Sequence, residues 1–278
     1  MNLGQLRRAY HEAICRQVLG YRAGVPNIAD KSSKKSVRLA QGILTRMGFP
    51  PCPNPPKGQR AGALFESLTL DYLQKAFHLV QHLRPGEWIF SVHGDVTVFD
   101  QYEHLTDLAR VLAQHPGLRA TLGDYLVKPD IVVGRRPVSD RQINQDADIL
   151  RDSTATLTPL RASNFSDPKP ILHASISCKW TIRSDRSQSS RTEALNLIRN
   201  RKGNTPHIVI VTAEPLPSRI ASVALGTGDL DCVYHMALYE LDKSIQEIAD
   251  ETLSEMFNLL VDGKRLRDIS DLPFDLAI

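Results

Sequence analysis

The sequence predicts a protein of mixed α and β structure, with helices covering a central mixed β-sheet. Two patterns support this prediction. Apolar residues recur at helical spacing in several long segments, and short apolar runs bounded by turn residues indicate buried strands. Such strands mixed with covering helices are typical of α/β or α+β proteins. At 278 residues the chain can form one large domain or two small ones, with a substantial core.

Composition excludes several classes of protein. The hydrophobic fraction of 42% and the charged fraction of 23% are ordinary for a globular protein, and no apolar run is long enough to span a membrane. Residues 1–20 have the pattern of an amphipathic helix and lack the apolar stretch of a signal peptide. The four cysteines lie far apart, with no CxxC pair, so we expect neither a structural zinc site nor a disulfide framework. A reduced, cytoplasmic protein is therefore expected.

The overall charge permits a nucleic-acid partner without requiring one. Lys and Arg number 34 against 31 Asp and Glu, a net charge of +3. DNA binding would therefore need a local concentration of positive charge. The basic, hydroxyl-rich run from Lys31 to Lys35 is either a solvated loop or a loop that contacts phosphates or bases.

The N-terminal part is expected to be largely helical. The pattern predicts a helix over 3–20, and six prolines make 26–58 irregular apart from a helical piece around 36–47. We therefore treat 1–58 as a helical N-terminal region of a single domain that spans 1–278. Residues 60–83 form a strong helix candidate, because Leu and aromatic residues recur there every three to four positions.

Strands and helices are expected to alternate through the rest of the chain. The expected elements are a strand, turn and strand at 87–99, a helix at 101–115, strands at 128–135 and 170–180, a helix at 190–201, a strand at 206–212 and a long helix at 241–261. The polar segment at about 136–168 has no clear period, so we interpret it as an insertion or long loop.

The strand at 170–180 carries the most informative pattern. Alternation along a strand places Ser177 and Lys179 on one face, whereas the opposite face, which includes Cys178 and Trp180, is wholly apolar. The two polar side chains should therefore project together from a sheet whose back is buried. The alternative for Lys179 is an ordinary residue at the sheet rim.

A carboxylate on the preceding strand suggests a catalytic role for Lys179. Asp130 follows Pro129 at the start of that strand, where an aspartate is otherwise a turn or cap residue. Together, Asp130 and Lys179 suit metal-assisted phosphodiester hydrolysis: the carboxylate holds a divalent cation, and the lysine orients water or stabilises the phosphate. This is the pattern PD…(D/E)xK, but Ser177 occupies the acid's position and cannot supply its charge.

Two other acids could supply the missing carboxylate. Glu193 is expected in the first turn of the next helix, although Ser190 and Glu193 also fit an S-x-x-E capping box. Glu66 lies on an apolar stripe of the 60–83 helix with Leu70 and Leu73, where a carboxylate is costly unless it binds metal or forms a buried ion pair.

The segment after Lys179 is rich in arginine. Arg183, Asp185 and Arg186 have the chemistry to recognise G and C in the major groove, because arginine suits the O6/N7 edge of guanine and aspartate can accept from N4 of cytosine. The alternative is a surface salt-bridge cluster, which would contribute little to stability.

These residues resemble a known family. Ser177-Cys-Lys179, then Arg183-Ser-Asp185-Arg186, then Glu193 are similar to the active site and recognition segment of type II restriction endonucleases that cut sites containing CCGG. Within the PD-(D/E)xK superfamily the resemblance is to the NgoMIV branch, in which the acid of the sheet is relocated to the following helix. It spans roughly residues 57–235 and implies an α/β fold: a restriction-endonuclease-like core with a central mixed β-sheet flanked by helices.

The resemblance also implies roles for individual residues. It makes Asp130, Glu66 and Glu193 the metal-binding acids and Lys179 the catalytic lysine, with Ser177 in the place of the usual acid. It implies that Arg183, Asp185 and Arg186 contact the inner base pairs and that Gln59 contacts the minor groove. The alternative for Gln59 is an ordinary glutamine at the start of a helix. Arg219, helped by the loop that contains Lys34, would contact the outermost base pair.

The implied activity is cleavage of both DNA strands at a palindrome with a CCGG centre. Mg²⁺ would be the cofactor, and in-line attack of a metal-activated water would leave 5′-phosphate ends, with 5′ overhangs. A palindrome implies a homodimer, built on the helix at 59–83 or that at 241–261, and dimers of some relatives pair into tetramers. The resemblance also implies a bacterial cytoplasm that contains a cognate cytosine methyltransferase.

Alternatives from other classes remain at this stage. One is a structure-specific repair or recombination nuclease of the same fold, and another is a non-catalytic DNA-binding module. A Ser-Lys hydrolase that uses Ser177 and Lys179 is disfavoured, because no oxyanion hole or third orienting group is visible in the sequence.

Overall fold

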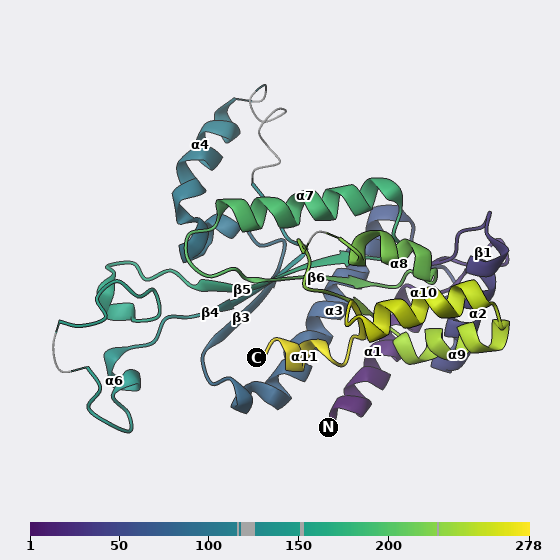
Figure 1. Cartoon of the computed structure of the whole chain (residues 1–278), viewed down its shortest axis with the longest axis horizontal. Helices are drawn as coiled ribbons and strands as arrows, with labels where there is room; N and C mark the ends of the chain where they lie inside the picture. The colour runs from purple at the N-terminus through teal and green to yellow at the C-terminus, as the bar shows by residue number, and fades with distance from the viewer. Residues whose placement is uncertain (116, 118–125, 151–152, 227) are drawn as a thin grey trace.

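A six-stranded mixed sheet forms the centre of the protein (Figure 1). A computed structural model describes residues 1–115, 117, 126–150, 153–226 and 228–278, with the backbone alone at 184–188. Strand β4 is antiparallel to both β3 and β5, whereas β5 to β8 are parallel to one another. In spatial order the strands are β3 (Trp88–Val92), β4 (Ile131–Arg135), β5 (Ile171–Lys179), β6 (His207–Thr212), β7 (Cys232–His235) and β8 (Leu266–Asp268).

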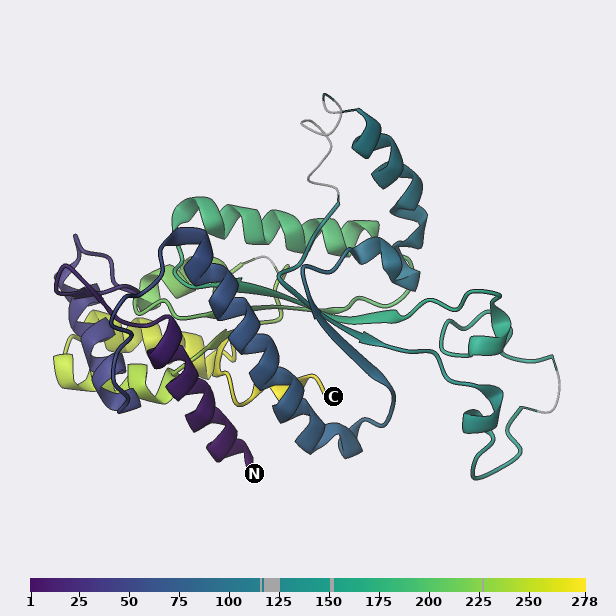
Figure 2. The same cartoon turned by 180° about the vertical axis from the view of Figure 1, so that it is seen from behind.

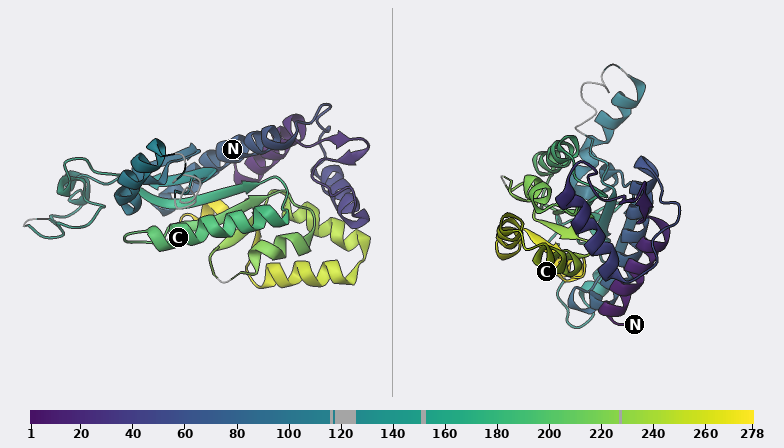
Figure 3. Two further views of the ribbon diagram at one scale, coloured as in Figure 1. Left: turned by 90° about the horizontal axis from the view of Figure 1, so that it is seen from above. Right: turned by 90° about the vertical axis from the view of Figure 1, so that its right-hand side faces the viewer.

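Helices cover both faces of this sheet (Figures 2 and 3). Helices α1 (Leu3–Gln17) and α3 (Gly58–Val80) lie on one face, and α7 (Ser184–Asn200), α8 (Pro217–Ala224) and α10 (Glu251–Asp262) lie on the other. The other α-helices among the described residues are α2 (Lys34–Met47), α4 (Thr106–Gln114), α6 (Asp140–Ile143), α9 (Leu238–Ile248) and α11 (Leu272–Asp275). The predicted architecture of a mixed sheet flanked by helices is confirmed. Across the described residues, no helix is both long and apolar enough to cross a membrane.

Local hydrogen bonds explain the N-terminal helices. Asn2 caps α1 and forms a capping box with Gln5, and Ser33 caps α2 by accepting from the Ser36 N–H. The Lys31–Lys35 run is therefore partly the beginning of α2. Between the two helices lies a short hairpin, β1 (Tyr21–Arg22) with β2 (Val25–Pro26), for which the sequence analysis made no prediction.

Two predicted elements are wrong. The second strand expected within 87–99 is replaced by a 3₁₀ turn, Val96–Val98, because the Asp95 carboxylate accepts hydrogen bonds from the backbone and hydroxyl of Thr97. The single helix expected at 241–261 is two helices, α9 and α10. Ala249 ends α9 in the left-handed conformation, with φ 54°, and Asp250 caps α10.

Helix α7 begins earlier than the sequence pattern indicates. It begins at Ser184, with Arg183 in the N-cap position, whereas the prediction placed its start near 190. Glu193 therefore lies well inside the helix, and the prediction that it belongs to the first turn is wrong. Because the chain leaves β5 at Lys179 and enters α7 at Ser184, only a short turn separates the strand from the helix.

The polar segment 136–168 extends away from the sheet (Figures 1 and 2). It contains the short helix α6 and a 3₁₀ turn, Ala162–Asn164, joined by irregular backbone. Its two ends are tied together, because Val138 bridges to Arg161 and the Arg161 guanidinium binds the Asp140 carboxylate at 2.7 Å.

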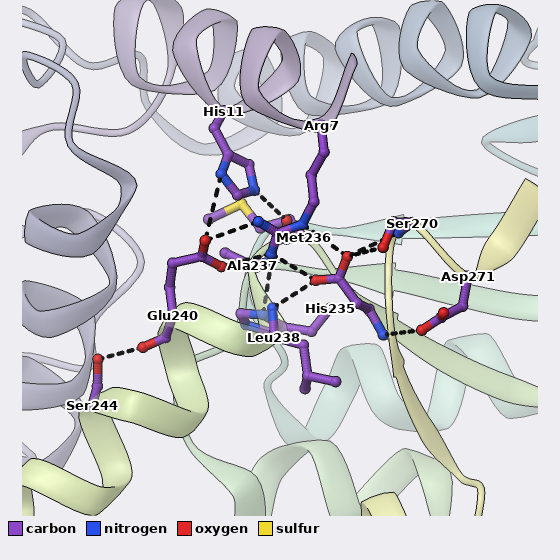
Figure 4. A network of polar contacts seen from close by, with 11 residues as sticks. Arg7, His11, His235, Met236, Ala237, Leu238, Glu240, Ser244, Ser270 and Asp271 are labelled. Carbon is purple, nitrogen blue, oxygen red and sulfur yellow. Dashed lines mark hydrogen bonds and ion pairs between the residues drawn. The ribbon is translucent and has the colours of Figure 1, made fainter. Parts of the chain in front are cut away.

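A buried ionic network joins the N-terminal helix to the C-terminal part of the sheet (Figure 4). Arg7 of α1 donates to Glu240 of α9 at 2.6 and 2.8 Å and to Asp268 of β8 at 2.8 and 2.9 Å. Asp268 also accepts the Leu238 N–H at 3.0 Å, and its side chain is completely buried. We call Arg7, Glu240 and Asp268 the Arg7 network. It fixes α1 against the sheet from the side opposite to α10.

Candidate active site

A cleft with a volume of about 730 Å³ opens at the carboxyl end of β5. Its walls come from four parts of the chain: the loop before α2, the start of α3, the turn after β3 with the start of β4, and the segment that follows β5. Five residues predicted from the sequence line it: Gln59, Glu66, Asp130, Lys179 and Arg183. The fold therefore brings together side chains that lie as far apart in the sequence as Gln59 and Arg183.

Asp130 and Lys179 form the centre of this cleft. Asp130 directly precedes β4, which runs antiparallel to β5, so its carboxylate faces the end of β5. Its Oδ2 accepts the Cys178 N–H at 2.7 Å and lies 3.1 Å from Lys179 Nζ, with both side chains about one-fifth exposed. Asp130 therefore bonds across strands rather than capping its own turn, and Lys179 is more than a rim residue.

The polar face of β5 is exposed only at its carboxyl end. His173 and Ser175 share the face of Lys179 but are buried, whereas Ser177 and Lys179 are half-buried. Helices cover both sides of the strand's first part, so the sheet's back and most of its front are closed. As expected, Ser177 and Lys179 project together from one face, but that face reaches the cleft only at the carboxyl end of the strand.

Glu193 reaches β5 from α7. Its Oε2 lies 3.4 Å from Ser177 Oγ, and its Oε1 accepts from Ser189 at 3.1 Å. The capping-box alternative is wrong, because α7 begins at Ser184 and the buried Ser190 hydroxyl has no hydrogen-bond partner among the described residues. The carboxylate is thus placed beside the serine that occupies the motif's acid position.

Glu66 lies in the wall formed by α3 and is only 13% exposed. Burial raises the pKa of its carboxyl group, and the neighbouring Asp130 raises it further, while His93 and Lys179 act in the opposite direction. The ion pair that the structure offers is His93 Nε2 at 3.8 Å, from a side chain that is 68% exposed. The buried ion pair considered for Glu66 is therefore weak.

His93 is a cleft residue that sequence analysis missed. Its backbone adopts the left-handed region, with φ 53°, and its N–H donates to the Asp130 carbonyl at 2.9 Å. At the next position only glycine fits, since a Cβ on Gly94 would lie 2.4 Å from Val132. The one available signal is the sequence His-Gly-Asp directly after a predicted strand, and that signal is weak.

The donor set suits a hard divalent cation, although the carboxylates do not converge in this structure. Among the described residues, no three His, Cys, Asp or Glu side chains are close enough to hold a metal ion as they stand. Asp130, Glu66 and Glu193 nonetheless offer the oxygen ligands that Mg²⁺ prefers. Burial and the neighbouring Asp130 raise the pKa of Glu66, so a cation bound here would favour its ionised form.

The predicted DNA-contacting residues differ in how the structure places them. Gln59, in the first turn of α3, and Arg183, at the N-cap of α7, line the cleft. Asp185 and Arg186 belong to the first turn of α7, but their side chains lie outside the described part of the structure.

Arg219 and Lys34 lie further from the centre. Arg219, on α8, pairs with Asp30, and its Nη1 lies 3.9 Å from Glu214. Asp30 and Lys31 line the cleft, whereas Arg219 and Lys34 are not among its lining residues, and Lys34 is the exposed first residue of α2. Asp30 was not predicted, because no local pattern shows that it meets a residue 189 positions away.

Sequence comparison assigns the family. Residues 10–278 match the profile of the NgoMIV restriction enzyme family. The chain is 48% identical over 261 residues to the type II restriction enzyme NgoMIV of Neisseria gonorrhoeae, a match that covers 92% of this chain and 91% of that protein.

Two solved structures are distantly similar. One is the restriction endonuclease PspGI in a complex with substrate DNA, with 13% identity, a TM-score of 0.31 and coverage of 99% of this chain and 92% of that one. The other is the type IIF restriction endonuclease Bse634I with cognate DNA, with 12% identity, a TM-score of 0.37 and coverage of 89% and 92%. Because both scores are low, the family assignment rests on the sequence matches. The chain belongs to the NgoMIV restriction enzyme family and is a type II restriction endonuclease, a site-specific hydrolase.

Proposed function

We propose that this enzyme cuts both strands of duplex DNA at a palindrome with a CCGG centre. The reaction is Mg²⁺-dependent hydrolysis of a phosphodiester bond, which leaves 5′-phosphate ends and 5′ overhangs. The observation that carries the proposal is the contact of Asp130 with Lys179 at 3.1 Å, beside the acidic Glu66, in a cleft that Arg183 also lines.

Five residues have a defined part in the chemistry, three of them in the cleft and two, Ser177 and Glu193, beside it. Asp130, Glu66 and Glu193 hold the cation, and the Ser177 hydroxyl orients the Glu193 carboxylate. A bound divalent cation supplies positive charge at the phosphate and lowers the pKa of water. Lys179, held by Asp130, places an ammonium group where negative charge develops on the phosphate.

Recognition uses the surfaces on either side of the cleft. Arg183, Asp185 and Arg186 contact the inner base pairs in the major groove, since the helix start that carries them borders the cleft. Gln59, on the opposite wall, contacts the minor groove. Arg219 and Lys34 contact the outermost base pair, with Arg219 acting through the rim at Asp30.

We further propose how the enzyme is organised and where it works. Residues 1–278 act as one domain, which the single hydrophobic cluster of buried residues supports. A homodimer matches the palindrome, with one active site for each strand. The host is a bacterium whose cytoplasm also holds a cognate cytosine methyltransferase.

Digestion of long unmethylated DNA of known sequence tests the proposal. Reactions with Mg²⁺ and with EDTA are compared, and the fragment ends are sequenced. We expect Mg²⁺-dependent fragments whose ends all lie at one CCGG-centred palindrome. A smear would favour a structure-specific nuclease, and a preparation that shifts CCGG duplexes without cutting them would favour a DNA-binding module.

A second experiment tests the relocated acid. Glu193→Ala should abolish cleavage, whereas Ser177→Ala should retain part of it, because only the carboxylate carries charge for the cation. Loss of all activity in Ser177→Ala with full activity in Glu193→Ala would overturn this assignment. Arg186→Ala should weaken binding to the cognate site by about 1–3 kcal/mol, measured by titration in EDTA.

A further inference from the structure

Glu214 is a buried carboxylate that the proposed chemistry does not use. It follows β6 by two residues, and its side chain has no exposed surface. Its Oε2 accepts the Ile182 N–H at 2.9 Å, and its Oε1 accepts the Leu216 N–H at 3.2 Å. One carboxylate therefore joins the turn after β5 to the beginning of α8.

The same residue is connected to the catalytic strand. The Thr212 hydroxyl donates to the Lys179 carbonyl at 2.7 Å, and it accepts the Glu214 N–H at 3.1 Å. Lys179 and Ile182 are thus both held by the end of β6, one at each end of the turn. Arg183, which lines the cleft, directly follows Ile182.

On its other side Glu214 faces the rim of the cleft. Arg219 Nη1 lies 3.9 Å from Glu214 Oε2, and the other end of that guanidinium pairs with Asp30. Asp30 lines the cleft beside Lys31. The carboxylate therefore contacts both segments that lead to the proposed DNA-contacting arginines.

We propose that Glu214 is a positioning residue. It fixes the positions of Arg183 and Arg219 relative to Lys179, so that the arginines that recognise the DNA sequence are aligned with the lysine that acts on the phosphate. The inference rests on the proposed recognition roles of these arginines. A buried carboxylate is costly unless all its partners are in place, so the partners it keeps are held in one arrangement.

The carboxylate cannot be replaced by its amide without a change in this arrangement. Both of its oxygens accept backbone N–H groups, whereas glutamine offers only one acceptor oxygen. In Glu214→Gln the amide NH₂ would face an N–H donor, either that of Ile182 or that of Leu216. The turn that precedes Arg183 or the start of α8 must then move.

The ionisation of Glu214 supports the same role. Burial raises its pKa to about 7, against the opposing effect of the Ile182 and Leu216 amides and of Arg219, while Asp30 raises it further. Among the described residues, a further titratable neighbour is His235 on β7, whose pKa burial lowers to about 4, so it is neutral in this range. Protonation near pH 7 removes the charge that faces Arg219.

The test compares Glu214→Gln with Asp268→Asn in the full-length enzyme. Asp268 is a matched control because it is also a fully buried carboxylate that binds an arginine and a backbone N–H, and it lies on β8 and does not line the cleft. Cleavage rates are measured on the site the parent enzyme cuts and on sites that differ from it by one base pair. We expect the ratio of these rates to fall roughly tenfold or more in Glu214→Gln, since small misplacements of contacting groups are costly. Asp268→Asn should lower the melting temperature without changing the ratio.

Two further measurements keep the inference falsifiable if Glu214→Gln folds poorly. The parent's ratio should fall as the pH is lowered through about 7, and Thr212→Val should lower the ratio in the same direction. A pH-independent ratio in the parent together with an unchanged ratio in Thr212→Val would overturn the proposal, as would equal ratios in Glu214→Gln and the parent. Because the ratio is defined on the site that the parent enzyme cuts, a site other than CCGG would contradict the proposed function without affecting this test.

Discussion

The cleft and the Arg7 network both place carboxylates beside cations, but only the network neutralises them. In the network, Arg7 contacts two carboxylates with four hydrogen bonds at 2.6–2.9 Å, and Asp268 is completely buried. In the cleft, Asp130 meets Lys179 at 3.1 Å, and Glu66 meets an exposed His93 at 3.8 Å. The carboxylates of the Arg7 network are thus fully paired with a cation, whereas those of the cleft are only partly paired.

The ionisation of the two groups follows this difference. Burial alone would raise the pKa of Asp268 and of Glu240, yet their hydrogen bonds to Arg7 lower both. The pKa of Glu66 is raised, because burial and Asp130 outweigh the cations nearby. In a structural network the neighbouring cations stabilise the ionised carboxylates. In a site prepared for a ligand, the negative charge of the carboxylates is compensated only when the ligand binds.

Loss of the central pair of the cleft should have the largest effect. We expect Asp130→Ala and Lys179→Ala each to lower the cleavage rate by about 10³-fold or more, because each removes a group that acts on the reacting phosphate. Site-specific binding should remain, as measured by gel shift in EDTA. Lys75→Ala, which breaks an exposed pair with Asp71, is the control. Cleavage at the parental rate in Lys179→Ala would refute its assignment.

The opposite outcome is expected for the network. Arg7→Met should reduce the free energy of unfolding by about 3–5 kcal/mol, because it leaves the buried Asp268 and the partly buried Glu240 without their cation. The measurement is urea denaturation. Below the unfolding transition the variant should still cleave DNA. Arg110→Met, which removes an exposed pair with Asp107, serves as the control and should leave stability nearly unchanged.

A pH titration distinguishes the two regions more finely. Burial lowers the pKa of His235, beside the network, to about 4, whereas in the unfolded chain it is close to 6.5. The unfolded state therefore binds more protons in this range, and stability falls as the pH is lowered from about 6.5 to about 4, by up to about 3 kcal/mol. His235→Gln should remove this part of the decline. Equal slopes of stability against pH in parent and variant would contradict the expectation.

The smallest effect is expected for substitution of Glu66, which should raise the stability of the protein rather than lower it. Because its pKa is raised, its ionised form is less stable in the folded protein than in the unfolded one. Without metal at pH 8, Glu66→Gln should therefore increase stability by about 1 kcal/mol. Added Mg²⁺ should raise the melting temperature of the parent but not that of the variant. A destabilised Glu66→Gln would show that Glu66 is a structural residue like Asp268.

Predictions from the sequence succeeded where the pattern lies in residues a few positions apart. Asp130, Ser177 and Lys179 lie on strands whose alternation is visible in the chain, and the structure joins Asp130 to Lys179 as expected. The predictions failed where a side chain competes with the backbone or ends a helix: the Asp95 turn replaced a strand, and Ala249 and Asp250 divided a helix. The start of α7 was also misplaced, since its first turn has no apolar repeat.

The sequence by itself determined the strands and helices that have strong periodicity, the residue types of the catalytic motif and the family. These depend on contacts between residues a few positions apart, or on motifs that the chain displays directly. The tertiary structure alone decided which distant groups meet: Glu193 with Ser177, Glu66 with His93, and Arg219 with Asp30. Such pairs are set by how helices pack on the sheet, and packing brings together residues with no relation in local pattern. For the same reason Glu214 becomes visible only in the fold, where its carboxylate meets the amide of Ile182.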